Sequence, residues 1–290
     1  MNTSIMVVIV MGLFGIFFGV VLAVANKKLA MEINPLIEIV DEVLPKGQCG
    51  ACGYAGCMAY AEAVVTKPEV SPNLCVPGKE EVANKVAELT GKAAGSVDAV
   101  NAQVRCAGSK CNAIDKYKYD GVQDCVAANL LMGGAKGCQY GCLGFGTCAN
   151  NCPFDAMYMS EEGLPVIDLD LCTGCGKCES VCPKNIIQMV PAGATVRINC
   201  SSKDKGSVAL KQCSVACTGC GLCKRNCSYG AIQVENNLAV IDSNICVSKC
   251  SEATCLLKCP TGAIRPVVSG VVPGNEVIQE RENETGTTVA

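Results

Sequence analysis

The chain has 290 residues, including 25 cysteines but no histidine or tryptophan, and its formal net charge is only −3. Without histidine it cannot form a Rieske centre, a histidine-ligated haem, a Cys/His zinc finger or a Ser–His or Cys–His catalytic pair. The small net charge gives no reason to expect a nucleic-acid partner. The cysteines are therefore the feature that a functional interpretation has to explain.

Residues 5–25 are uncharged and almost wholly apolar, which is about the length that crosses a bilayer as a helix. Lys27 and Lys28 follow directly, so the positive-inside rule places the remaining chain on the cytoplasmic side. A cleaved signal peptide is the alternative, because residues 23–25 form an A-x-A pattern, but it would need a basic start and a shorter apolar core. We expect residues 1–28 to be a single-pass anchor in the cell membrane. In the reducing cytoplasm, clustered cysteines bind metal more often than they form disulfides.

Residues 29–91 are predicted to form a small helical domain around one iron–sulfur site. Apolar residues at helical spacing predict one helix over 33–44 and another over 80–91. Between them the glycines of CGACGYAGC suit a tight loop around a cluster. The predicted ligands of this [4Fe–4S] cluster are Cys49, Cys52, Cys57 and Cys75. A zinc site or a thiol redox pair is the alternative, since spacing alone does not exclude zinc. Residues 92–103 are small and polar, and predict a linker.

From residue 104 the chain repeats a pattern in which a cysteine group precedes two short predicted strands around a polar turn. The clearest group has the ferredoxin spacing C-x2-C-x2-C-x3-C-P, in which three cysteines ligate one [4Fe–4S] cluster and the fourth ligates another. A looser group, C-x3-C-x5-C-x3-C-P, precedes it. The predicted ligand sets are Cys138, Cys142, Cys148 and Cys182 for one cluster, and Cys172, Cys175, Cys178 and Cys152 for the other.

A second pair of groups follows with nearly the same spacing. Its predicted ligand sets are Cys217, Cys220, Cys223 and Cys259, and Cys246, Cys250, Cys255 and Cys227. We therefore expect an α+β fold with two ferredoxin-like modules of the βαββαβ type, each with two [4Fe–4S] clusters, over 104–195 and 196–266. Residues 267–290 lack cysteine and aromatic residues, and predict a disordered tail.

Five cysteines remain outside these groups. In each half of the repeat a Val-Arg pair leads to a lone cysteine, and a second lone cysteine precedes the ferredoxin motif. Two equivalent pairs suit a sixth cluster shared between the repeats. The predicted ligands are Cys106, Cys125, Cys200 and Cys213, with Cys111 as a substitute for one of them. Buried structural thiols are the alternative, because free cysteine is often a small core residue.

The order of these motifs resembles the B subunit of the Rnf complex, the membrane-bound ferredoxin:NAD⁺ oxidoreductase of bacteria and archaea. The residues that carry the resemblance are the N-terminal membrane helix, CGACGYAGC with Cys75, YGCLGFGTCANNCPFDA and CTGCGKCESVCPKNII, so it covers nearly the whole chain. The second module is similar to that of the longer form of this subunit. The resemblance implies electron transfer from reduced soluble ferredoxin, through [4Fe–4S] clusters, toward NAD⁺ reduction coupled to Na⁺ or H⁺ transport. It also implies membrane and flavoprotein subunits as partners, with no stand-alone catalytic residues in this chain.

Residues 196–265 carry nine basic against four acidic residues, although the whole chain is slightly acidic. Because soluble ferredoxins are usually acidic, we predict a docking surface at Lys224, Arg225 and Lys249; an ordinary solvated surface is the alternative. Two other functions remain open. One is an electron donor to a redox-sensing regulator or another reductase, and the other is a zinc-binding structural protein.

Overall fold

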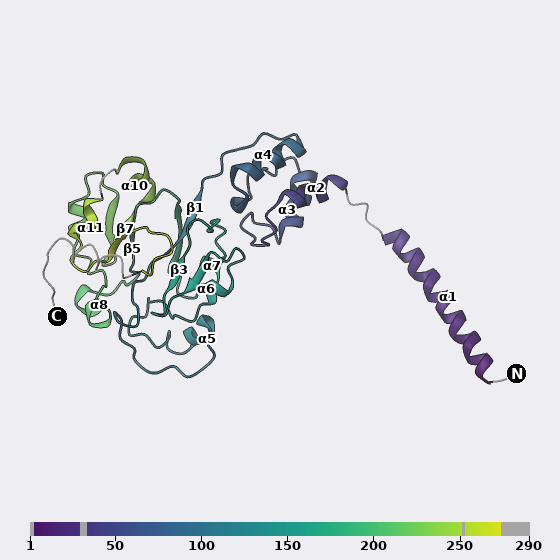
Figure 1. The fold of residues 1–290 in the computed structure, drawn as a ribbon, viewed down its shortest axis with the longest axis horizontal. Coiled ribbons are helices and arrows are strands. Elements are labelled where there is room, and N and C mark those ends of the chain that lie inside the picture. The colour runs from purple at the N-terminus through teal and green to yellow at the C-terminus, as the bar shows by residue number, and fades with distance from the viewer. Residues whose placement is uncertain (1–2, 30–33, 251–252, 274–290) are drawn as a thin grey trace.

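The computed structural model describes residues 3–29, 34–250 and 253–273 of a mixed α/β chain. The described chain begins with α1 (Thr3–Leu29), continues through a small helical unit, and ends in two cysteine-rich units built from short paired strands (Figure 1). We call these the helical unit (34–91), the first unit (100–191) and the second unit (196–266).

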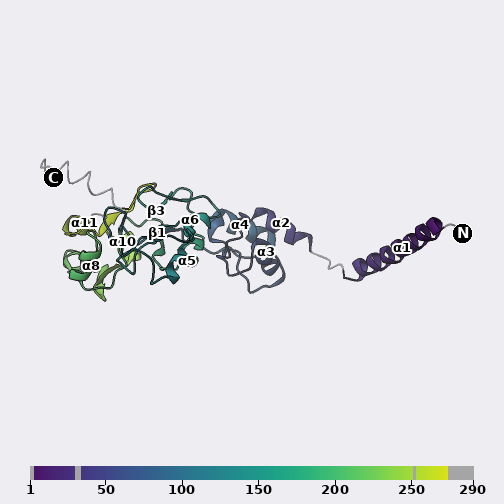
Figure 2. The same ribbon diagram turned by 90° about the horizontal axis from the view of Figure 1, so that it is seen from below.

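Helix α1 stands apart from the folded remainder of the chain (Figure 2). Its segment Met6–Lys28 is the one described helix that is long and apolar enough to cross a membrane, and none of its most apolar window is buried inside the protein. The predicted anchor therefore has a helix of the required length. The two lysines expected to face the cytoplasm lie in its last turn.

The helical unit packs three helices around a small apolar core. They are α2 (Pro35–Val43), α3 (Cys57–Thr66) and α4 (Lys79–Thr90), with the short 3₁₀ helix η1 (Val76–Gly78) leading into α4. Asn34 starts α2 because its side-chain oxygen accepts a hydrogen bond from the Leu36 N–H at 3.0 Å. Tyr60 of α3 is almost fully buried in the core, and its hydroxyl donates to the Ser71 carbonyl at 2.9 Å.

The segment predicted as a linker is bound to its neighbours at both ends. The Lys92 ammonium donates hydrogen bonds to the carbonyl oxygens of Val64, Lys67 and Val70, at 2.7, 2.6 and 2.8 Å. At the other end, strand β1 (Val100–Val104) begins inside the predicted linker. Its polar composition did not reveal these tertiary contacts, which leave only a short connection between the helical unit and the first unit.

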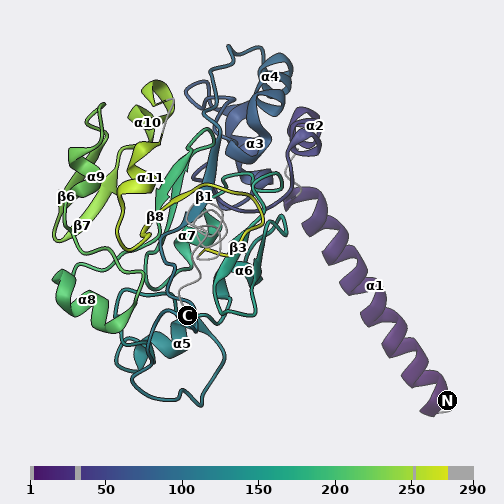
Figure 3. The ribbon, with the colours of Figure 1, turned by 60° about the vertical axis from the view of Figure 1, so that its left-hand side comes forward.

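The first and second units share one plan, in which the first strand pairs antiparallel with the last and the two middle strands form a hairpin (Figure 3). The first unit contains β1, α5 (Cys125–Leu130), α6 (Thr147–Asn150), β2 (Met157–Met159), β3 (Pro165–Ile167), α7 (Lys177–Ser180) and β4 (Ile187–Pro191). The second contains β5 (Val196–Ile198), α8 (Gly206–Gln212), α9 (Leu222–Arg225), β6 (Ile232–Glu235), β7 (Leu238–Ile241), α10 (Ser243–Lys249), α11 (Thr254–Lys258) and β8 (Ile264–Pro266).

Cysteines make up a large part of both cores. Of the sixteen buried side chains in the core of the second unit, six are cysteines, and the remainder are small or medium apolar residues such as Ala263 and Ile264. Four of the eleven buried side chains in the core of the first unit are cysteines. Side chains this small leave space between the sulfurs that apolar packing does not fill.

The first residues of the predicted disordered tail are ordered. Backbone and side-chain bonds tie them to the hairpin of the first unit: Gly270 N–H donates to the Ile167 carbonyl at 2.9 Å, and the Ser269 hydroxyl accepts from the Leu169 N–H at 2.9 Å. Val272 packs against the core of the first unit. The disorder prediction is therefore wrong for residues 267–273, because a segment without an apolar pattern of its own can be held by a neighbouring unit. Residues 274–290 lie outside the described residues.

Candidate iron–sulfur sites

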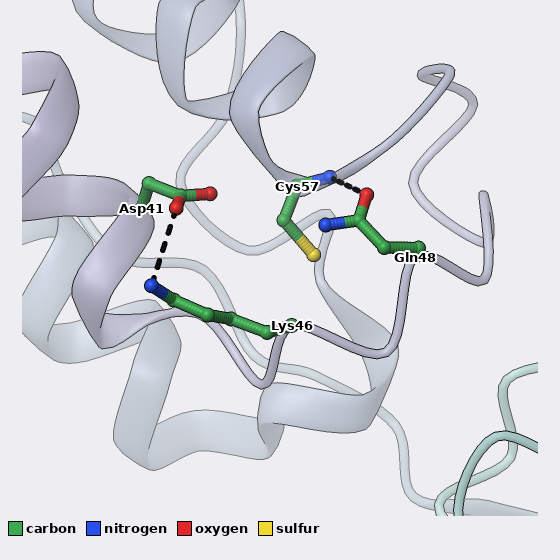
Figure 4. Close-up of polar contacts among 4 residues, drawn as sticks. All are labelled: Asp41, Lys46, Gln48 and Cys57. Atoms are coloured by element: carbon green, nitrogen blue, oxygen red, sulfur yellow. Dashed lines mark hydrogen bonds and ion pairs between the residues drawn. The ribbon is translucent and has the colours of Figure 1, made fainter.

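The cysteines of the helical unit come from one loop and the ends of two helices. Cys57 is the first residue of α3, and Cys75 precedes η1. The loop before α3 is pinned at two points, since Lys46 pairs with Asp41 at 3.4 Å and Gln48 Oε1 accepts from the Cys57 N–H at 3.0 Å (Figure 4). Burial raises the pKa of Cys75 to about 11, and the nearby thiols of Cys49, Cys57 and Cys52 add to the rise. The four predicted ligands therefore lie close together.

In the first unit, a cavity of about 340 Å³ lies among four sulfurs that the ferredoxin spacing assigned to one cluster. They are Cys152, Cys172, Cys175 and Cys178. The Cys172 sulfur accepts a hydrogen bond from the Ala102 N–H of β1 at 3.5 Å. Backbone N–H groups aimed at sulfur stabilise a thiolate ligand and tune the potential of a bound cluster.

The second unit contains two further groups of four cysteines. Cys217, Cys220, Cys223 and Cys259 line a cavity of about 330 Å³. The other group is recognised from the pKa of Cys255. Burial, together with the nearby thiols of Cys246, Cys250 and Cys227, raises this pKa to about 11, so these four cysteines lie close together. The structure thus brings together both of the ligand sets predicted for this unit.

The remaining predicted set of the first unit is assembled differently. A cavity of about 370 Å³ is lined by Cys142, Cys148 and Cys182, as predicted, but the fourth cysteine is Cys125. Cys138 instead lines a separate cavity with Cys106, Cys200 and Cys213. The structure therefore exchanges Cys125 and Cys138 between the two sites that the sequence predicted. Cys111 is exposed and does not belong to any of these groups.

A network of hydrogen bonds explains the position of Cys125. Asp124 caps α5, with Oδ1 accepting from the N–H groups of Val126 and Ala127 at 2.8 and 3.0 Å. Its other oxygen accepts from the Thr147 hydroxyl at 2.7 Å, and Thr147 Oγ1 accepts from the Cys125 N–H at 2.9 Å. Thr147 immediately precedes Cys148, so the network places Cys125 beside that ligand.

Comparison of the two units shows why this ligand has to come from elsewhere. Cys142 and Cys148 are six residues apart, as are Cys217 and Cys223 in the second unit. The middle cysteine of the second unit, Cys220, therefore corresponds to Phe145. The insertion that carries Cys125 packs Tyr119 against the Phe145 ring, with the ring centroids 5.2 Å apart. The signal that could have identified Cys125 is this missing middle cysteine, together with roughly twenty extra residues upstream of it.

The spacing of the sulfurs favours a cluster over a single metal ion. Within the described residues, no three cysteine, aspartate or glutamate side chains converge closely enough to bind one ion. Four thiolates around zinc would lie about 2.3 Å from a single atom. The four cysteines of a [4Fe–4S] cluster surround a larger body, because each binds a different iron. Four cysteines line each of the three cavities described above, which is the number of ligands that such a body requires.

Comparisons with known proteins identify the same regions. Residues 44–77 match a family model described as a putative Fe-S cluster, and residues 165–188 match a 4Fe-4S binding domain. A further 4Fe-4S binding domain matches 142–156 and 217–231, the two segments that align Phe145 with Cys220. Cys106, Cys125, Cys138, Cys200 and Cys213 lie outside all of these matches.

Whole-chain relatives are more specific. The B subunit of the proton-translocating ferredoxin:NAD(+) oxidoreductase complex of Clostridium ljungdahlii is 58% identical over 98% of both chains. Its Na(+)-translocating counterpart in Acetobacterium woodii is 43% identical over 91% of this chain and 78% of its own. The B subunit of an ion-translocating oxidoreductase complex of Methanosarcina acetivorans is 39% identical over 86% of this chain and 93% of its own. The chain therefore belongs to the family of B subunits of ion-translocating oxidoreductase complexes, which confirms the resemblance to the Rnf family.

Proposed function

We propose that this chain accepts electrons from reduced ferredoxin and relays them to the other subunits of a membrane complex that reduces NAD⁺ and translocates Na⁺ or H⁺. Two relatives are named as subunits of ferredoxin:NAD(+) oxidoreductase complexes, one translocating protons and the other Na(+). The described chain supports a relay because its cysteines are gathered into sites that hold redox cofactors. We assign the flavin and nicotinamide sites to other subunits.

We infer that the first and second units are ferredoxin-like modules, each with two [4Fe–4S] sites, and that the helical unit carries one more. The support is the shared strand plan and the matching cysteine groups. The proposed ligand sets follow the sequence prediction except for the exchange of one residue, and the changed set is Cys125, Cys142, Cys148 and Cys182. A [4Fe–4S] cluster, when bound, takes up and releases one electron without bond chemistry by side chains.

The observation that carries the proposal is the contact between the helical unit and the first unit. The side chains of Cys49 and Cys175 lie against each other, and this contact is the largest cause of the lowered pKa of Cys49 and the raised pKa of Cys175. Beside them the Phe154 ring packs on Gly47, where a Cβ atom would lie 2.6 Å from the ring. Ligands of two separate sites therefore touch across the boundary between units, as electron relay requires.

Ligands of the two sites within the first unit also lie close to each other. The Cys178 thiol lies close enough to Cys148 and Cys152 for their charges to raise its pKa. In the second unit, Cys223 lies within α9 and Cys227 follows two residues after the end of that helix, so ligands of both of its sites lie on one short segment. The protein keeps neighbouring sites adjacent and buries many of the sulfurs, which shields them from water.

We propose that ferredoxin docks on the second unit at Lys224, Arg225 and Lys249, which are all exposed. The Arg225 guanidinium lies beside one site, since it donates to the Cys220 carbonyl at 3.4 Å, and Lys249 adjoins Cys250. Two residues that contributed to the basic surplus of this region do not reach the surface. Arg197 and Arg265 are 6% and 2% exposed and lie opposite each other in the β5–β8 pair. The exposed surplus is therefore smaller than the sequence count, and Arg225 and Lys249 contribute to it beside cysteines of this unit.

The docking proposal is tested by charge reversal with a matched control. Lys224→Glu, Arg225→Glu and Lys249→Glu in one chain should lower the second-order rate of reduced-ferredoxin oxidation by at least about tenfold at low salt, and should weaken its salt dependence. The control reverses three exposed lysines outside the second unit, Lys67, Lys79 and Lys118, and changes the net charge equally. Equal rates for the two triple variants would refute this docking surface while leaving the relay itself intact.

We also propose that α1 crosses the membrane once, with the cysteine-rich units on the cytoplasmic side. The apolar span ends at Lys27 and Lys28, as the positive-inside rule expects for its cytoplasmic end. Between Thr3 and Ala25 the helix has no ionisable side chain, which favours an ion path in other subunits. Protease digestion of sealed vesicles of known orientation is the test. Protection of the cysteine-rich units in inside-out vesicles would contradict this orientation.

A further inference from the structure

Four cysteines that no family model covers surround a cavity of about 410 Å³ between the first and second units. They come from four separated segments: Cys106 follows β1, Cys138 precedes Cys142, Cys200 follows β5, and Cys213 ends α8. Cys106 and Cys200 are each only 7% exposed. The cavity therefore lies at the joint between units, whereas the two cavities described above for the first unit, and the one for the second, each lie within a single unit.

The joint is formed by the segments that carry these cysteines. The Ala107 N–H donates to the Asn199 carbonyl at 3.0 Å, and the Ser201 hydroxyl donates to the Arg105 carbonyl at 2.9 Å. Near Cys213, the Ser214 N–H donates to the Asn112 carbonyl at 2.9 Å. Each pair lies next to one of the cysteines, so the interface fixes both halves of the cysteine group in position.

The environment of the sulfurs suits thiolate ligands. The Cys106 sulfur accepts hydrogen bonds from the N–H groups of Gly108 and Cys142, both at 3.4 Å. The Cys200 sulfur accepts from the N–H groups of Cys217 and Ser202. The Lys136 side chain also lines the cavity, and brings a positive charge to the four sulfurs. Donors and a cation around the four sulfurs would offset the negative charge that ligation requires.

The group is also equivalent in the two units. Cys138 and Cys213 each lie four residues before the first cysteine of a ferredoxin motif, Cys142 and Cys217. Cys106 and Cys200 each follow the first strand of their unit. The N–H bonds of the preceding paragraph repeat this equivalence, because Cys142 donates to Cys106 as Cys217 donates to Cys200. Each unit thus contributes two sulfurs in corresponding positions.

We propose that Cys106, Cys138, Cys200 and Cys213 bind a sixth [4Fe–4S] cluster that connects the two units. The inference rests on the proposed relay, for which it supplies the missing link between the Cys142 site and the Cys217 site. It differs from the set expected from the sequence by taking Cys138 in place of Cys125. A merely structural group of thiols would explain the burial, but not the paired N–H donors or the cation.

The test is to count iron and sulfide per full-length chain after anaerobic purification in detergent, with zinc measured in the same samples. Cys138→Ala and Cys200→Ala should each remove about four irons from a total of about 24. The double variant of these two should remove no more than either single one, because both break the same site. Cys125→Ala combined with Cys200→Ala should remove about eight, because these residues belong to different sites. Cys111→Ala is the control, and should keep the full complement.

The possible results separate the alternatives. An eight-iron loss from the Cys138–Cys200 pair, with a four-iron loss from the Cys125–Cys200 pair, would overturn the exchange of ligands. About 20 irons in the unaltered chain, or one zinc at the joint, would overturn the sixth cluster and leave the relay proposal standing. Circular dichroism and the electron paramagnetic resonance of the other clusters show whether a variant still folds. Failure of the relay itself would instead appear as a fully loaded chain that does not oxidise reduced ferredoxin.

Discussion

Lys92 is expected to fix the helical unit to the chain that leads into the first unit. Its ammonium is bound by three carbonyl oxygens at or just beyond the C-terminal end of α3, where helix carbonyls lack partners within the helix. Hydrogen bonds to charged groups contribute about 1.5–3 kcal/mol each at best. Because Lys92 is only partly buried and regains hydration when released, about 2–4 kcal/mol for the three together is the reasonable value.

Lys92→Met removes these bonds and keeps the apolar stem. The amides of α3 that exchange by local opening should then lose protection by about 30- to 700-fold, since 1.4 kcal/mol is a factor of ten. Hydrogen exchange followed by mass spectrometry on the anaerobic full-length chain measures this directly. Lys85→Met is the matched control, because its ion pair with Glu81 lies on the exposed face of α4 and should contribute little. Unchanged exchange in α3 after Lys92→Met would refute the reasoning.

Three further predictions concern the cysteine sites. In a Cys125→Ala chain, the further change Phe145→Cys should restore about four irons, because it supplies the missing middle ligand of the motif. Iron counting checks this, and an iron content that stays low would contradict the alignment of Phe145 with Cys220. Gly174→Ala should disrupt its site, because a Cβ there meets the carbonyl of Val100, whereas Gly176→Ala meets no atom within 4 Å and should cost only the strain of its positive φ; thermal loss of cluster absorbance compares the two. Chelating iron should unfold the cysteine-rich units before the helical unit, because only one of the ten buried core side chains of the helical unit is a cysteine. Simultaneous loss of the helical and strand signals in circular dichroism would count against this order.

The strongest sequence motifs predicted the sites that the structure assembles. The run from Cys172 to Cys178 and the run from Cys217 to Cys223 encode a local loop, so spacing alone places three sulfurs around one centre. The fourth ligand of each set, Cys152 or Cys259, comes from the other motif of the same unit. Short-range chain geometry determines the first three positions, and the packing of the unit brings in the fourth.

The exchange of Cys125 and Cys138 could not be read from spacing. Phe145 interrupts the motif, and its replacement ligand lies about twenty residues upstream, where the bonds of Asp124 and Thr147 bring it into the site. Residues 92–98 and 267–273 show the same limit. Their compositions predicted a linker and a disordered tail, yet Lys92 and Gly270 bond to distant parts of the chain. In each case the determining contact joins residues that are remote in sequence.

The ordered start of the C-terminal segment has a mechanical consequence. The chain enters the second unit directly from β4 and, after β8, returns to the hairpin of the first unit at Gly270. The second unit is therefore attached to the first unit at both of its ends, which restrains rotation between the two units more than one attachment would. A stop codon after Pro266 would keep all 25 cysteines and remove one support. Bending between the units would then be resisted mainly by the joint around Cys106 and Cys200, which makes such a truncation a way to vary stiffness without altering any ligand.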